Sequence, residues 1–171
     1  MRYGQLLLMA ILIPWFSMKP APIATLALDP YQSVEFRTAL FEASKVYGKG
    51  GCGDAKLAEM TARNAARTGL PANLIASIVV IESTCNPLAI NKTTGDVGIM
   101  QLDLSAQGAA YDFQSVNPFN PERNMEMGSN ILAASVKTYG VRKGVGRYNG
   151  VGPNMDIYSA RVLAMAGPLR K

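Results

Sequence analysis

The sequence has no histidine and only two cysteines among its 171 residues. The missing imidazole excludes Ser-His-Asp and Cys-His catalysis, histidine-ligated zinc and histidine-based proton shuttles. Two thiolates are also too few for a four-cysteine metal site. An enzyme built from this chain must therefore work mainly with carboxylates, hydroxyls, amines and backbone groups.

Charge is also scarce, because charged residues make up 17% of the chain and hydrophobic residues 49%. This composition is typical of a folded chain, and the length corresponds to one domain. The net charge of +5 is not gathered into a run of Lys or Arg, so we expect no nucleic-acid partner. A mildly basic chain is compatible with an anionic polymer such as a bacterial cell wall, although such a charge is also ordinary.

The hydrophobic run at residues 5–16 is too short to cross a membrane, since a span needs about 20 apolar residues. It follows the positively charged Arg2, as in a secretory signal. Residues 1–27 are therefore predicted to be a signal peptide cleaved near Ala27, with a retained N-terminal anchor as the alternative. The domain at 28–171 is expected to be exported, periplasmic or otherwise extracytoplasmic, without a stable membrane span after cleavage.

An oxidising compartment favours a disulfide between Cys52 and Cys85. The alternative is a pair of unpaired, buried thiols. A bridge that closes this loop of roughly 30 residues would contribute about 3–4 kcal/mol to stability in the chain-entropy model.

Capping residues and apolar periodicity predict a mainly α fold with at most a minor β element. The predicted helices cover residues 30–47, 55–68, 71–83, 105–110, 121–139 and 155–165. Residues 88–101 indicate a long loop or a small β-hairpin, and the glycine-rich stretch 144–152 indicates another loop. The first helix is expected to bury Val34, Leu40 and Phe41.

Glu82 is the most informative residue. Leu74, Ile78 and Glu82 recur every four residues, so a carboxylate ends an apolar stripe of the third predicted helix. Burial and the negative end of the helix dipole both raise the pKa of such a carboxyl. A carboxylic acid that stays protonated near neutral pH can serve as a general acid. The alternative is a glutamate that bends out to solvent at a helix end.

Four sequence motifs follow one another from Glu82 onward. They are ES-TC-NPLA…GDVGIMQ (82–101), FNPERNM (119–125), RYNG (147–150) and YSARV (158–162). In this order they resemble the motifs of the lytic transglycosylase catalytic domain, which is soluble-type and goose-lysozyme-like. The resemblance covers about residues 55–166. It is closest to small specialised members found with secretion, conjugation and phage-entry machines.

This resemblance implies a lysozyme-like helical domain with Glu82 at the floor of a substrate groove. It implies cleavage of the β-1,4 bond between N-acetylmuramic acid and N-acetylglucosamine in peptidoglycan. Ordinary glycosidases use two carboxylates. One suffices if the sugar's own 6-hydroxyl attacks, which leaves a 1,6-anhydro end. No metal and no cofactor is needed. The implied partners are peptidoglycan strands and components of an envelope-spanning secretion or conjugation machine.

The same motifs supply candidate substrate-binding residues, each with a structural alternative. Ser83 could hold the carboxylate or cap its helix, and Asn91 could face the reacting sugar or stabilise its own turn. Gly98 could let the backbone approach the substrate groove closely, or it could simply be a glycine required by a turn. Met100 is more typical of core packing, and Gln101 is the better candidate for a hydrogen bond to sugar.

Tyr148 combines an apolar face for a sugar ring with a hydroxyl that could reach Glu82. Its neighbour Asn149 completes the candidate set. Because Cys85 follows Glu82 by three residues, a Cys52–Cys85 bridge would also fix the end of the catalytic helix.

The chain departs from the family pattern at Cys85, Asp96 and Asp103. Asp103 stands where the family often places a substrate-contacting residue. Two alternative functions follow. One is a muramidase that uses water with Asp96 or Asp103 as its second carboxylate. The other is a non-catalytic, wall-binding assembly subunit with the same fold.

Overall fold

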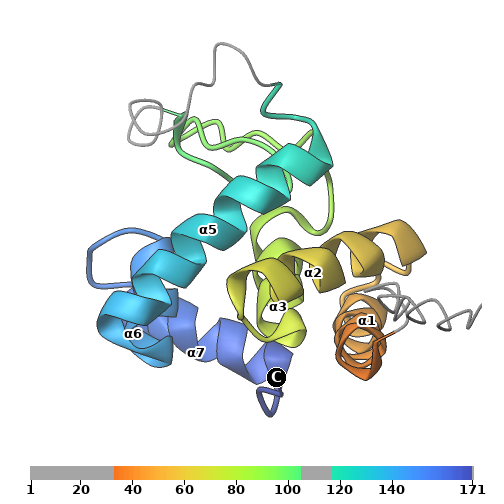
Figure 1. The fold of residues 1–171 in the computed structure, drawn as a ribbon. Helices are drawn as coiled ribbons and strands as arrows, with labels where there is room; N and C mark the ends of the chain where they lie inside the picture. Colours follow the sequence, from red (N-terminus) through yellow and green to blue (C-terminus); the bar gives the residue numbers. More distant parts are fainter. Residues whose placement is uncertain (1–32, 105–116, 171) are drawn as a thin grey trace, which may run out of the picture.

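The computed structural model describes residues 33–104 and 117–170, and these form a mainly helical domain (Figure 1). Its helices are α1 (Val34–Lys49), α2 (Ala55–Thr68), α3 (Ala72–Ser83), α5 (Pro121–Tyr139), α6 (Val141–Tyr148) and α7 (Met155–Ala166). The β structure in these residues amounts to two isolated bridges, Ile90 to Val97 and Val97 to Leu102. The predicted fold class is therefore confirmed, whereas the short helix predicted at 105–110 lies outside the described residues.

The central helix is α3, which packs against α1, α2 and α7 (Figure 1). Residues 72–80 are all buried, as expected for a helix in which apolar residues dominate every face. Even α3 is too short for a membrane span, and none of the other described helices is long and apolar enough to be one. The buried course of α3 ends at Val80, two residues before Glu82, which is the first charged residue along the helix.

Most helix boundaries follow from the capping residues in the sequence. The Asp54 side chain accepts the Lys56 amide at 2.8 Å at the start of α2, and Asn120 accepts the Arg123 amide at 3.1 Å at the start of α5. Pro121 is pre-shaped for the first helical position, where its missing N–H costs nothing. At the end of α2, Gly69 adopts the left-handed conformation that glycine tolerates.

The start and the buried face of α1 differ from the prediction. Ser33 is extended and its hydroxyl accepts the Phe36 amide at 3.0 Å, so the helix begins at Val34 and not at residue 30. Val34 and Phe41 are 65% and 62% exposed, and Leu40 is half-buried. The prediction that Val34 and Phe41 are buried is wrong because the opposite face packs on α2 and α3. That face carries Phe36, Ala43, Val46 and Tyr47. Leu40 is partly buried and does pack against the core.

The predicted loop at 144–152 is also wrong in its first half, which belongs to α6. A Cβ on Gly144 would lie 2.6 Å from the Val136 Cα, and one on Gly146 would lie 2.8 Å from the Met155 carbonyl oxygen. The two glycines therefore let α6 pack closely on α5 and on the start of α7. They serve helix packing and do not break the helix.

A disulfide joins Cys52, in the short link between α1 and α2, to Cys85, two residues after α3. The two Cα atoms are 6.0 Å apart. The bridge fixes the chain where it leaves the central helix, directly after Glu82.

Candidate active site

Glu82 lies in the last turn of α3, where the helix emerges from the core and the side chain is partly exposed. Burial raises the pKa of its carboxyl from 4.5 to about 7. The nearby charge of Asp96 adds to this rise, whereas a hydrogen bond from Tyr158 and the charge of Arg161 oppose it. A large fraction of Glu82 is therefore protonated near neutral pH, which is the state that a general acid requires.

Tyr158, in the first half of α7, donates a hydrogen bond from its hydroxyl to Oε1 of Glu82. The ring is buried. Burial and the adjacent Glu82 hold the pKa of the phenol far above its usual range, so the hydroxyl remains a donor. In the sequence, Tyr158 is identified only as part of the YSARV motif. The sequence still offers one indication of its role, because a tyrosine hydroxyl that is buried needs a hydrogen-bond partner.

Tyr148, at the end of α6, makes a different contact from the one predicted. Its hydroxyl donates to the Met100 carbonyl at 2.9 Å and not to Glu82. Burial raises the pKa of this phenol well above 10. Gly128 of α5 leaves the space for this contact, since a Cβ there would lie 2.8 Å from the Tyr148 hydroxyl and 2.7 Å from the Met100 sulfur.

Asn124, fully buried in α5, organises the segment at 95–101. Its Oδ1 accepts the Met100 amide at 2.8 Å, and its Nδ2 donates to the carbonyls of Val97 (3.0 Å) and Pro118 (2.9 Å). Gly98 has φ +81°, and a Cβ on it would lie 2.1 Å from Asn124 Nδ2. Gly98 thus makes room for Asn124. Asn124 is not among the site residues predicted from the sequence, although it stands in the FNPERNM motif.

Two candidate residues bind the same segment to α3 and to itself. The Ser83 hydroxyl donates to the Ile99 carbonyl at 2.8 Å, and Gln101 Nε2 donates to the Gly98 carbonyl at 2.9 Å. Roles of Ser83 and Gln101 toward substrate stay predictions. Met100 is completely buried in the core, which confirms the packing role favoured from the sequence. Its place among the candidate substrate-binding residues is wrong, because the core encloses the side chain.

The two candidate asparagines are exposed. Asn91 Oδ1 accepts the amides of Thr93 (3.0 Å) and Thr94 (3.3 Å) and so stabilises its own turn. Asn149 caps the C-terminal end of α6. Contact of either residue with substrate stays a prediction. Within residues 33–104 and 117–170, no group of three Cys, Asp or Glu side chains is placed to hold a metal ion.

Backbone strain occurs directly after α3 and at the end of the segment at 95–101. Among the described residues other than glycine, positive φ angles occur at Thr84 (51°), Cys85 (64°) and Gln101 (48°). The left-handed region is costly for such residues, above all for a β-branched threonine. Strain of this kind persists where the surroundings impose it, and it gathers at functional sites. Here the disulfide at Cys85 and the hydrogen bonds of Gln101 hold the strained chain in place.

A helical domain whose central helix ends in a partly buried acid of raised pKa is consistent with a lysozyme-like protein. The family model described as the transglycosylase SLT domain matches residues 59–159, more than half of the chain. The match includes Glu82, Asn124 and Tyr158. The chain therefore belongs to the transglycosylase SLT domain family, whose members are lytic transglycosylases that act on peptidoglycan. A search of curated proteins found no match.

Proposed function

We propose that this protein cleaves the β-1,4 bond between N-acetylmuramic acid and N-acetylglucosamine in peptidoglycan and leaves a 1,6-anhydro-muramic end. The observation that carries the proposal is the state of Glu82. Its carboxyl pKa is raised to about 7, and one of its oxygens is held by Tyr158. Membership of the family supplies the class of substrate.

In the first step Glu82 acts as a general acid. Tyr158 donates to Oε1, so the proton of the neutral acid resides on Oε2. Oε2 gives this proton to the glycosidic oxygen as the bond from that oxygen to the anomeric carbon breaks. The strand beyond the bond leaves with a free hydroxyl, and positive charge develops on the muramic ring.

In the second step the Glu82 carboxylate acts as a general base. It removes the proton of the 6-hydroxyl on the same muramic residue while that oxygen bonds to the anomeric carbon. The anhydro ring closes, Glu82 regains its proton, and no water is consumed. Attack within one sugar exploits effective molarity, so a second protein carboxylate is not required.

A muramidase remains the second candidate because Asp96 lies close enough to raise the pKa of Glu82. In that mechanism a carboxylate would activate water on the sugar or stabilise the intermediate. Asp96, however, accepts a hydrogen bond from the Thr94 hydroxyl at 2.5 Å within its own turn. This contact favours a role in holding the loop.

We further propose that residues 1–27 direct export and that the enzyme acts outside the cytoplasm, in the periplasm or an equivalent compartment. The proposal is supported by the charged start and short apolar run of that segment and by the Cys52–Cys85 disulfide. The small domain suits local opening of the wall for a secretion or conjugation machine.

The test is mass spectrometry of the soluble products after the purified protein digests peptidoglycan sacculi. Anhydro-muropeptides are expected from the parent, and Glu82→Gln should release none. Asp96→Asn is the matched control, since it neutralises a nearby carboxylate, and it should still give anhydro products. Muropeptides with reducing ends that disappear in Asp96→Asn would instead establish the muramidase. Products from Glu82→Gln equal to those of the parent would overturn the assignment of the acid.

A further inference from the structure

Positive charge is concentrated on one part of the described chain. Residues 137–156 contain four cations and one acid, Asp156, whereas the other described residues hold nearly equal numbers of cations and acids. The four cations are Lys137, Arg142, Lys143 and Arg147, and we call them the basic surface. They lie at the end of α5 and along α6. Such an asymmetry indicates an anionic partner.

The cations of the basic surface are not neutralised by neighbouring acids. Ion pairs elsewhere engage Lys45, Arg63 and Arg123. None of the ion pairs within residues 33–104 and 117–170 includes a member of the basic surface. Lys137, Arg142 and Lys143 are exposed, and Arg147 is partly exposed. Their charge is therefore available to a ligand in solution.

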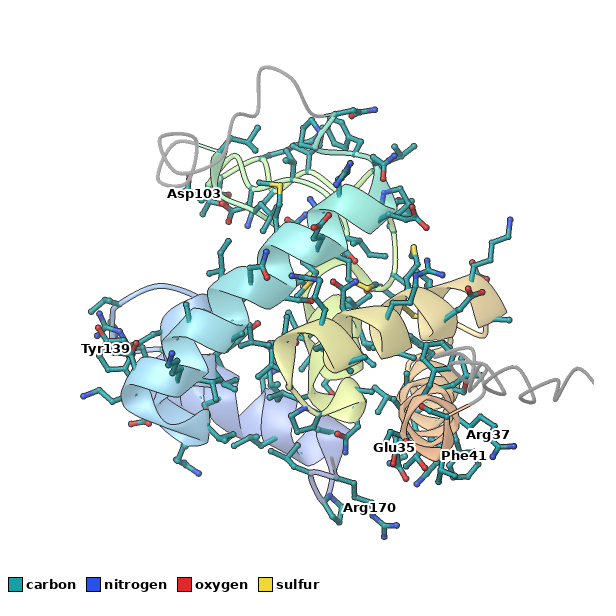
Figure 2. All side chains as sticks on the ribbon, viewed as in Figure 1. Glu35, Arg37, Phe41, Asp103, Tyr139 and Arg170 are labelled. Atoms are coloured by element: carbon teal, nitrogen blue, oxygen red, sulfur yellow. A yellow bond between two sulfur atoms is a disulfide. The ribbon has the colours of Figure 1, made fainter. Side chains whose placement is uncertain are left out.

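Tyr139 orders part of this surface. The Arg147 guanidinium lies 4.2 Å from the centre of its ring, and the Lys143 ammonium lies 5.7 Å from it. Figure 2 shows Tyr139 at the edge of the molecule, and the side chain is 42% exposed. Contact with the ring restrains two long side chains before any ligand arrives, which lowers the entropy lost on binding.

An open hollow of about 710 Å³ lies beside the ring. Its lining includes Tyr139, Arg142, Lys143, Pro153 and Met155, with Asp156 as its acid. Guanidinium and ammonium groups around a partly apolar hollow fit a short peptide that carries carboxylates.

α6 and α7 each carry a residue of the hollow and a residue that contacts Glu82 or the segment at 95–101. The eight residues of α6 span about 12 Å, and Tyr148 at the end of that helix bonds to Met100. Asp156 of the hollow precedes Tyr158 by two residues, and Tyr158 contacts Glu82. α6 therefore carries three cations of the basic surface as well as Tyr148, and α7 begins at the hollow and carries the tyrosine that contacts Glu82.

We propose that the basic surface binds the carboxylates of the peptide stems of peptidoglycan, outside the catalytic centre. This inference rests on the proposed function for its polymer, and it adds a binding site that works independently of bond cleavage. The surface holds the enzyme on intact, peptide-bearing wall through charge-assisted hydrogen bonds.

Binding is measured by cosedimentation of full-length Glu82→Gln protein with intact sacculi, so that no strand is cleaved. Adding Arg142→Gln and Lys143→Gln should weaken binding about three- to tenfold, because two exposed charge contacts are lost. The matched control adds Arg37→Gln and Lys56→Gln, which remove the same charge from α1 and α2. The control should bind like Glu82→Gln alone.

Sacculi whose carboxyl groups have been converted to amides test the chemistry of the ligand. Glu82→Gln should bind them more weakly than intact sacculi, and the Arg142/Lys143 variant should show little further loss. Equal binding by the variant and its control would overturn the proposal. Cosedimentation with vesicles rich in anionic phospholipid is measured alongside. If the Arg142/Lys143 variant bound these vesicles more weakly than its control but bound sacculi equally well, the surface would be assigned to lipid headgroups and the proposal would be overturned.

Failure of the proposed function looks different. The otherwise wild-type protein, incubated with the same sacculi, would then release no anhydro-muropeptides. The Arg142/Lys143 variant would nevertheless retain its binding defect relative to the control.

Discussion

Glu82 is an acid kept in surroundings that oppose its charge, and this has a consequence for stability. Because its pKa is about 7 in the folded protein against an ordinary 4.5, the folded state holds the proton more tightly than the unfolded chain. The resulting stabilisation is complete below pH 4.5 and is lost as the pH rises through 7. Its size is up to about 3 kcal/mol.

Glu82→Gln removes this titration and should therefore change how stability depends on pH. The free energy of unfolding of the parent, minus that of the variant, should fall by up to about 3 kcal/mol between pH 4 and pH 8. Denaturant unfolding at several pH values measures the difference, in which the titrations common to both proteins cancel. A difference that is constant over this range would contradict the raised pKa.

Tyr158→Phe should change catalysis and the pH profile together. The tyrosine hydroxyl stabilises the Glu82 carboxylate, so its loss raises the pKa of the acid further. The alkaline decline of kcat/KM should move to higher pH by up to about one unit. The rate should drop about ten- to hundredfold because the carboxyl is no longer held. Rates of product release from sacculi over pH 5–9 give both quantities.

Tyr47→Phe is the control for this change. Tyr47 is also buried, and its hydroxyl pairs with that of Thr61 at 2.6 Å in another part of the core. Its loss should cost about 1 kcal/mol of stability and leave the pH profile in place. If the two variants shifted the profile equally, a specific role for Tyr158 would be refuted.

At the scale of helices, the sequence predicts elements best where a cap or a proline marks the start. Asn120 and Pro121 identify the first residue of α5, and Asp54 identifies that of α2. The sequence does not predict α6 because a glycine can indicate either a loop or a close contact between helices. Gly144 and Gly146 suggest a loop, yet they are small because neighbouring backbone lies where a Cβ would be. Only the tertiary packing distinguishes these cases.

The same limit applies to the site. Periodicity places Glu82 at the end of a buried apolar stripe, because the stripe is a property of a single helix and can be found from its sequence alone. Which tyrosine meets it depends on how α6 and α7 cross α3, so the sequence favoured Tyr148 and the structure places Tyr158 there. The role of Asn124 was not predicted for a similar reason, because its hydrogen-bond partners Met100 and Val97 lie some 25 residues earlier in the chain.

Gly128→Ala should test the close packing of α5 over the site. The added Cβ would lie within 3 Å of the Met100 side chain and the Tyr148 hydroxyl. We expect a loss of about 1–3 kcal/mol of stability and reduced activity, because the segment at 95–101 must shift. Thermal unfolding and product release measure the two effects.

Gly48→Ala is the matched substitution in α1, where a Cβ would have nothing within 4 Å. It should leave activity unchanged and stabilise the protein by up to about 1 kcal/mol, since alanine is the better helix former. A Gly128→Ala variant as stable and active as Gly48→Ala would show that α5 can move away without cost.

Across the whole molecule, the Cys52–Cys85 bridge connects global stability to the geometry of the site. The cysteines are 33 residues apart, and this span includes α2 and α3. Closing a loop of that length restricts the unfolded chain and contributes about 3–4 kcal/mol. On the folded side, the bridge holds the left-handed turn at Thr84 and Cys85 that follows Glu82.

Replacing both cysteines by serine should therefore produce two separable losses. Tm should fall by about 6–15 °C, as expected for 3–4 kcal/mol in a domain of this size. Activity measured at temperatures well below Tm, where the protein is fully folded, should also be lower. The left-handed turn can then relax, and the Glu82 side chain can move away from Tyr158. Reductant should reproduce both losses in the parent and leave the double variant unaffected. A lower Tm with undiminished activity would mean that the bridge supports the fold alone and that the contacts of α3 suffice to orient Glu82.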